Sequence, residues 1–124
     1  MPVSNPAAHL PIPQDDHYAD IRESVRRICA DYPGAYWREL DERSAYPSEF
    51  VQAMTDAGYL AALIPEAWGG AGLPLRAAGV ILEEVHASGG NAGATHAQMY
   101  TMGTLLRHGS AEQKNLYLPQ IAAG

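Results

Sequence analysis

Hydrophobic residues recur at helical spacing along most of this chain. In the first such stretch, Ile21, Val25 and Ile28 follow one another at intervals of four and three residues. These intervals place the three aliphatic side chains on one face of a helix. Charged residues fill the other face: Asp20, Arg22, Glu23, Arg26 and Arg27. We therefore predict an amphipathic helix that begins at residue 15 or 16 and ends near Pro33.

Two further helices are predicted before residue 59. A weak helical pattern runs from about Trp37 to Asp41. A clearer helix begins at Ser48, whose hydroxyl is a plausible N-cap, and Pro47 suits its first turn. Gly58 ends this helix, because glycine readily adopts the conformation that terminates one. The apolar face of the clearer helix consists of Phe50, Val51, Met54 and Ala57.

Glycine and proline interrupt the helical rhythm in residues 59–74. Residues 67–74 contain three glycines and a proline, a composition that favours turns over a regular element, so we expect an ordered loop. A helix resumes at Leu75 and runs to Ala87, where a serine and two glycines end it. The apolar face of this helix consists of Leu75, Ala78, Leu82 and Val85.

The last two predicted helices differ in character. Residues 92–108 contain one formally charged residue, Arg107. The other residues are small, apolar or weakly polar on every face of the predicted helix. We therefore predict a buried central helix, capped by Asn91. Ser110 and Gln113 have the spacing of a capping box, which starts a final helix that reaches about Leu118. Because no segment shows the alternation typical of a strand, the predicted fold is an all-α helical bundle.

The opening of the chain is unlike the rest. Four prolines stand among the first 14 residues, and each fixes φ and removes a backbone donor. We expect residues 1–14 to form an extended or disordered tail that lacks the features of a signal peptide. Residues 15–124 then form one small domain, since a chain of this length buries enough surface for a single core.

Charge and composition exclude several kinds of partner. The chain has 8 Lys and Arg residues against 14 Asp and Glu residues, for a formal net charge of −6. Nucleic acids and anionic membranes bind basic surfaces, so neither is expected as a partner. The longest apolar run, residues 59–65, is far short of the roughly 20 residues of a membrane span. The single cysteine, Cys29, allows no internal disulfide and fits a reducing, cytoplasmic compartment.

Several motifs that could carry chemistry are incomplete. The two glycine clusters lack the spacing of a dinucleotide-binding loop or a P-loop, and neither follows a strand. Glu83 and His86 share a helix face, but a metal site of this kind needs a second such pair, so no metal ligand is predicted. We expect Glu83, Glu84 and His86 to form a polar face in water. The serines lack the strained turn of a hydrolase nucleophile.

One face of the predicted helix 92–108 is a candidate ligand surface. His96 lies one turn after Ala92 and one turn before Tyr100, and Gly93 lies beside them. Small residues at one end and polar rings at the other would suit a groove that admits a ligand chain and closes at its base. The same pattern is compatible with a core histidine bonded to a backbone carbonyl. Spacing alone leaves both interpretations open.

Six motifs occur in a specific order between residues 16 and 124. A Tyr-Pro-Ser-Glu-Phe start at 46–50 precedes Ala-Gly-Tyr-Leu at 57–60, and the loop Ile-Pro-Glu-Ala-Trp-Gly-Gly-Ala-Gly follows at 64–72. Leu-Glu-Glu-Val at 82–85 comes next. Leu-Arg-His-Gly-Ser-Ala-Glu-Gln-Lys at 106–114 is then closed by Tyr-Leu-Pro at 117–119. In this order the motifs resemble the N-terminal α-helical domain of the acyl-CoA dehydrogenase family.

The resemblance implies an enzyme larger than this domain. Members of the family use FAD to remove two hydrogens across the Cα–Cβ bond of an acyl-CoA thioester, and electron-transfer flavoprotein accepts the electrons. They add a β middle domain and a helical C-terminal domain, and assemble as homotetramers or homodimers. The catalytic base and most FAD contacts lie in those added domains. No catalytic or cofactor-binding residue is therefore assigned here, and the chain alone is expected to be inactive.

The resemblance does assign a substrate-binding surface. In the family, the fifth helix of the N-terminal domain lines the fatty-acyl cavity, and here that helix is residues 91–108. Its wall is carried over onto Ala92, Gly93, His96 and Tyr100. We hypothesise that the rings of His96 and Tyr100 shorten or polarise the bottom of the cavity. Such a cavity would prefer a short, branched or polar acyl group.

Two alternatives to the dehydrogenase stay open. A stand-alone helical binding module would use the groove for a partner helix or an acyl ligand, without catalysis. A flavin monooxygenase or acyl-CoA oxidase on the same fold would differ in flavin surroundings that lie outside this chain.

Overall fold

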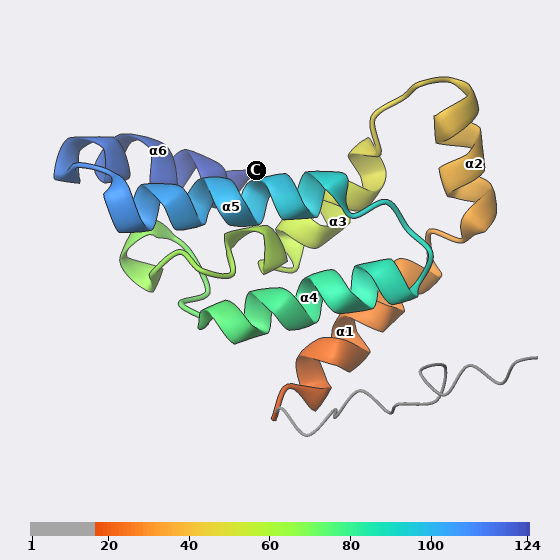
Figure 1. Ribbon diagram of the computed structural model, residues 1–124, viewed down its shortest axis with the longest axis horizontal. Coiled ribbons are helices and arrows are strands. Elements are labelled where there is room, and N and C mark those ends of the chain that lie inside the picture. Colours follow the sequence, from red (N-terminus) through yellow and green to blue (C-terminus); the bar gives the residue numbers. More distant parts are fainter. Residues whose placement is uncertain (1–16) are drawn as a thin grey trace, which may run out of the picture.

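The computed structural model describes residues 17–124, which fold into six α-helices and two short 3₁₀ turns (Figure 1). The elements are α1 (Ala19–Ala30), α2 (Gly34–Glu42), α3 (Ser48–Asp56), η2 (Tyr59–Ala61), η3 (Glu66–Trp68), α4 (Leu75–Ala87), α5 (Gly93–His108) and α6 (Ala111–Ala123). Residues 17–124 contain no strand, which confirms the predicted all-α class. The predicted tail, residues 1–14, lies outside the described residues.

The helices pack around one core. α5 and α6 lie side by side, α4 runs beneath α5, and α1 packs against the other side of α4 (Figure 1). α2 projects to one side and makes little contact with the other helices. The largest fully buried side chains come from α1, α3, α4, α5, α6 and the loop after α3: Val25, Phe50, Met54, Ile64, Ile81, Val85, Thr95, Met102 and Leu118.

The first helix follows its predicted apolar stripe, with one correction. Val25 is fully buried, and Ile21 and Ile28 are half-buried against the core. Arg22, expected on the exposed face, is buried, with 5% of its surface accessible. The reason is that α4 covers more of α1 than the aliphatic stripe alone, and it supplies a carboxylate partner for this guanidinium.

The loop between α3 and α4 is ordered by its own backbone, as predicted. The amides of Gly72 and Leu73 donate to the carbonyls of Ile64 and Ala62, at 2.8 and 2.7 Å. Gly70 lies so close to this turn that a Cβ there would be 1.9 Å from the carbonyl oxygen of Ile64. The sequence therefore needs glycine at that position because of a close approach rather than an unusual φ.

Of the three predicted caps, only the one at Ser110 is the N-cap of its helix. The N-cap of α5 is Ala92, and Asn91 lies one residue before it, where its side chain accepts a hydrogen bond from the amide of Gly93 at 2.8 Å. The predicted capping box is present, since Ser110 and Gln113 bond each other's backbone amides at 3.1 and 2.9 Å. Ser48, however, is the first residue of α3 rather than its N-cap, and its hydroxyl makes no cap bond.

Two expectations about the last helices were wrong. α5 is not buried all round, because only Thr95, Met99 and Met102 of its residues are buried. Its partners in the described part of the chain cover one side and leave the other exposed. α6 continues to Ala123 although Pro119 lies inside it. Packing outweighs the missing backbone donor, since Leu118 is fully buried just before that proline.

Within residues 17–124, no helix is long and apolar enough to cross a membrane.

Candidate functional site

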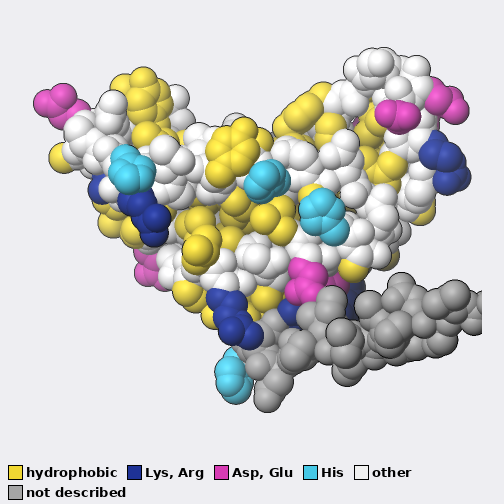
Figure 2. Space-filling view, viewed as in Figure 1, with side chains coloured by type: hydrophobic (Ala, Val, Ile, Leu, Met, Phe, Trp, Pro, Cys, Tyr) yellow, Lys and Arg dark blue, Asp and Glu magenta, His cyan; other side chains and the backbone are white. Residues whose placement is uncertain are grey.

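An apolar groove lies between α4 and α5. Its volume is about 790 Å³, and its lining comes mainly from these two helices. Figure 2 shows hydrophobic side chains gathered along this part of the surface, with histidines near them. The lining residues are Leu63, Leu75, Ala78, Gly79, Leu82, His96, Met99, Tyr100, Gly103, Thr104, Leu106, Arg107 and His108.

The α4 wall is apolar because α4 has more hydrophobic residues than its core face can bury. Ala78 is buried at the floor, whereas Leu82 is half-buried and Leu75 is 73% exposed. These residues belong to the stripe that the spacing predicted to face the core. The structure divides that stripe between the core and the groove. Gly79 widens the groove at this wall, since nothing lies within 4 Å of where its Cβ would be.

Two of the four predicted substrate-binding residues line the groove. His96 and Tyr100 lie one turn apart on α5, with their rings edge to face and their centroids 5.3 Å apart. Both side chains are exposed, so His96 is not the core histidine that the spacing also allowed. An imidazole and a phenol at one wall of an apolar groove can donate hydrogen bonds to a polar group on a ligand.

Ala92 and Gly93 are not brought into the groove lining. Ala92 is buried in the core just before α5, with 3% of its surface accessible. Gly93 is exposed, but it faces the side chain of Asn91 rather than the groove. The groove instead continues toward the other end of α5.

The residues at that other end were missed as groove residues. Gly103, Thr104, Arg107 and His108 line it together with His96 and Tyr100. Their positions continue the helical spacing that starts at His96, so an extension of the same face toward the C-terminus could have found them.

The chemistry of the lining fits a hydrocarbon chain. Its only formally charged side chain is Arg107, and the rest is mostly aliphatic or small. Its hydrogen-bond donors, among them His96, Tyr100 and Arg107, lie among these apolar side chains. Among residues 17–124, no group of three His, Cys, Asp or Glu side chains could hold a metal ion. The lining makes the groove a candidate site for an apolar ligand.

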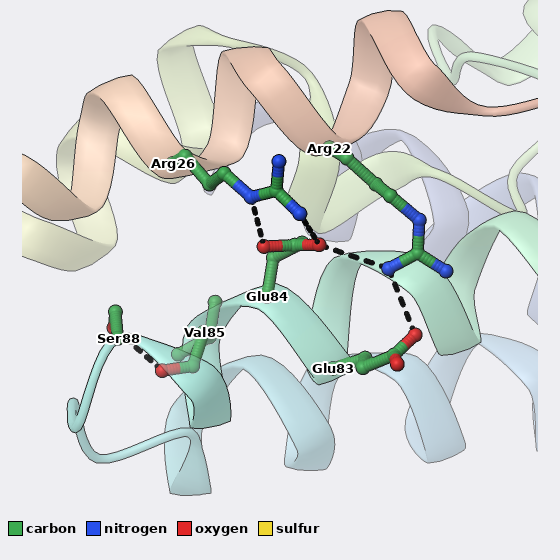
Figure 3. Close-up of polar contacts among 6 residues, drawn as sticks. All are labelled: Arg22, Arg26, Glu83, Glu84, Val85 and Ser88. Carbon is green, nitrogen blue, oxygen red and sulfur yellow. Dashed lines mark hydrogen bonds and ion pairs between the residues drawn. The ribbon is translucent and has the colours of Figure 1, made fainter. Parts of the chain in front are cut away.

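A buried ion cluster lies on the opposite side of α4 (Figure 3). The guanidinium of Arg26 contacts both carboxylate oxygens of Glu84, at 2.7 and 2.9 Å. Arg22 bridges Glu84 and Glu83 through Nη1, at 2.9 Å to each. Glu84 was expected in water, but it is 96% buried, with 4% of its surface accessible. Its position under α1 depends on packing between residues 62 apart, which spacing along α4 does not reveal.

The cluster keeps Glu84 ionised. Burial acts first and would raise the pKa of the Glu84 carboxyl, but the hydrogen bonds and positive charges of Arg26 and Arg22 outweigh it and lower the pKa below its ordinary value. Cys29 lies nearby, and burial raises the pKa of its thiol. A thiol of that kind stays protonated and is a poor nucleophile.

Comparison with known proteins gives a family and several relatives. The family described as "Acyl-CoA dehydrogenase, N-terminal domain" matches residues 15–124. "Probable acyl-CoA dehydrogenase FadE25" of Mycobacterium tuberculosis is 32% identical over 110 residues, which cover 87% of this chain and 28% of that protein. "Short-chain specific acyl-CoA dehydrogenase, mitochondrial" of Mus musculus is 31% identical over 114 residues, covering 85% and 27%. "3-(aryl)acrylate reductase" of Clostridium sporogenes is 29% identical over 113 residues, covering 86% and 30%.

The chain thus spans less than a third of the length of these relatives. The family match, in contrast, extends over nearly all of the chain and over every helix described above. On this evidence the chain belongs to the acyl-CoA dehydrogenase family, of which it is the N-terminal helical domain.

Proposed function

We propose that this domain works as part of an FAD-dependent dehydrogenase that oxidises the Cα–Cβ bond of an acyl-CoA thioester. The observation that carries the proposal is the apolar groove of about 790 Å³ on α5, in a chain that matches this family over residues 15–124. When bound in the complete enzyme, FAD would accept the hydride that leaves Cβ. The residues of this chain supply a wall for the acyl group and exclude water from it.

In this proposal, the catalytic base and most FAD contacts belong to other domains of the enzyme. Residues 15–124 form the helical domain, and a β middle domain and a helical C-terminal domain of the complete enzyme would carry the base and the FAD contacts. The described residues support this division, because the groove lining contains no carboxylate that could act as a base. The 124-residue chain by itself is inactive in this proposal.

His96 and Tyr100 set the preferred length of the acyl group. Their two rings lie against each other on one wall of the groove, where a long straight chain would need small side chains. Ala92 and Gly93 contribute at the neighbouring end of the helix, as expected from the family. They would do so through backbone and packing, since their side chains do not face the groove lined by the described residues.

Truncation of His96 tests this specificity. In the full-length enzyme, His96→Ala should raise the ratio of kcat/KM for octanoyl-CoA to that for butyryl-CoA about tenfold, because a shortened wall admits added methylenes. His86→Ala is the matched control, since His86 is an exposed histidine of α4 that does not line the groove. An unchanged ratio in His96→Ala would contradict the proposal that the His96 ring limits the length of the acyl group.

The partners of the complete enzyme follow from the same proposal. They are an acyl-CoA substrate, electron-transfer flavoprotein as electron acceptor, and further copies of the enzyme in a homo-oligomer in the cytoplasm. Native mass spectrometry of the protein from its own cells measures chain length, bound flavin and subunit number together. A longer chain with FAD in a dimer or tetramer is expected. A flavin-free chain of 13.3 kDa would contradict the enzyme and favour a helical binding module.

A further inference from the structure

Two faces of the α4 helix make different contacts. One face lines the groove with Leu75, Ala78 and Leu82. The other packs against α1 and contains Glu84, which is buried and bonded to Arg22 and Arg26. Because both faces belong to one short rigid helix, any shift of α4 along α1 moves the groove wall by the same amount.

Support for α4 comes mainly from α1. The packing between α1 and α4 is more extensive than that of any other helix pair in residues 17–124, whereas α4 and α5 touch much less. The two helices that form the groove therefore pack against each other less extensively than α1 and α4 do. The position of α4 relative to α5 is set by the α1 interface, on the side of α4 that faces away from the groove.

Apolar contacts alone fix that interface weakly along the helix axes. Dispersion and hydrophobic burial are not directional, so they define the register of α4 on α1 less sharply than a directional bond does. Charged hydrogen bonds are directional, and a planar guanidinium opposite a carboxylate fixes both distance and orientation. The ion cluster is the part of the interface that can define its register.

Arg22 and Arg26 contact the carboxylate of Glu84 from two sides. Arg22 and Arg26 are one turn apart on α1, and the carboxylate of Glu84 lies between them (Figure 3). Arg26 makes a two-point contact at 2.7 and 2.9 Å, and Arg22 ties the same carboxylate to Glu83. Movement of α4 in either direction along α1 would lengthen one of these contacts.

We propose that Arg22, Arg26 and Glu84 are positioning residues for the groove: they fix the register of α4 on α1 and so set where the α4 wall of the groove lies relative to α5. This inference rests on the proposed function only for the identity of the ligand that binds in the groove. The placement of the wall itself is a property of this domain.

Glu84→Gln in the full-length enzyme tests the proposal, because glutamine keeps the shape of the side chain and removes its charge. We expect the ratio of kcat/KM for octanoyl-CoA to that for butyryl-CoA to change at least about threefold, a difference of roughly 0.7 kcal/mol in relative transition-state binding. Glu23→Gln is the matched control, since Glu23 forms an exposed ion pair with Arg27 within α1 at 3.6 Å. Assays run well below the melting temperature of each variant.

A purely structural role would lower the melting temperature of Glu84→Gln and leave that ratio unchanged, and this result would overturn the proposal. If Glu84→Gln does not fold, Arg26→Gln takes its place, because Arg26 is half-exposed and Arg22 remains to pair with Glu84. The same change in the ratio is expected.

A second readout separates this proposal from the proposed function. The crystal structure of the Glu84→Gln enzyme should show α4 displaced along α1, with Leu82 moved relative to Met99 across the groove. An α4 helix in its original place would overturn the positioning role whatever the substrate. An enzyme that ignores every acyl-CoA tested, but shows the displaced helix, would overturn only the proposed function.

Discussion

At the scale of single residues, Glu84 should make the stability of the domain depend on pH. Its pKa is lower in the folded protein than in the unfolded chain, so the unfolded chain binds more protons as the pH falls below the ordinary value of 4.5. The stabilisation is therefore complete above that value and is lost as the pH falls through the lower, folded-state pKa. We expect the urea midpoint to fall in acid for this reason.

Glu84→Gln should separate this contribution from that of other carboxylates. Removing one partner of a buried ion pair costs about 3–5 kcal/mol, so the variant should be less stable at pH 7. Its stability should also fall less steeply in acid, because the group that titrates is gone. Urea unfolding at pH 7 and pH 3.5 measures both effects. Parallel pH profiles for the wild-type chain and this variant would contradict the assignment.

Gly70, in the loop before α4, and Gly79, inside α4, should respond oppositely to substitution by alanine. Gly70→Ala places a Cβ 1.9 Å from the carbonyl oxygen of Ile64, so the loop must move, at a cost of about 3 kcal/mol. Gly79→Ala meets nothing within 4 Å and lies inside α4, where alanine gains about 0.5–1 kcal/mol over glycine. Thermal unfolding of the two variants should therefore show melting temperatures shifted in opposite directions, and equal shifts would argue against the tight loop.

At the scale of elements, the capping box should anchor the start of α6. Ser110→Ala removes the hydroxyl that accepts from the amide of Gln113 at 3.1 Å, for an expected loss of about 1 kcal/mol. Ser48→Ala is the matched control at the start of α3, because the Ser48 hydroxyl makes no cap bond. Chemical denaturation of both variants compares them directly. An equal loss in Ser48→Ala would mean that the capping geometry at Ser110 is not what stabilises α6.

Local signals predicted the elements well where one interaction decides the outcome. The bounds of α4, the stop at Gly58 and the capping box at Ser110 each depend on residues within one or two turns. Local signals failed where packing between residues far apart in the chain determines how far a helix extends. Pro119 indicated a helix end near Leu118, but burial of Leu118 and a hydrogen bond from Gln98 to the carbonyl of Ile121 carry α6 past it.

The site was predictable to the same extent. Helical spacing placed His96 and Tyr100 on one face of α5, and they do line the groove together. Spacing could not show that Ala92, just one turn earlier, lies before the helix and enters the core. Nor could it show the α4 wall or the pairing of Glu84 with α1, since both depend on contacts between helices far apart in the chain.

At the scale of the whole molecule, α5 combines a low charge with incomplete burial. A helix with a single formally charged residue is suited to a protein interior, yet much of α5 faces outward in residues 17–124. Several large apolar side chains share this exposure: Tyr46, Leu75, Tyr100, Leu116 and Tyr117. Surfaces of this kind in a domain that spans less than a third of its relatives are suited to contacts with further protein.

The isolated 124-residue chain should therefore associate with itself, since exposed apolar side chains lower the free energy by burying one another. We expect light scattering to give an apparent mass above 13.3 kDa that rises with protein concentration. Leu75→Gln and Leu116→Gln distinguish the surfaces, because Leu75 lies at the groove and Leu116 on α6. Whichever variant restores the monomer mass identifies the surface through which copies meet. A monodisperse wild-type monomer at high concentration would contradict this account and show that both surfaces tolerate water.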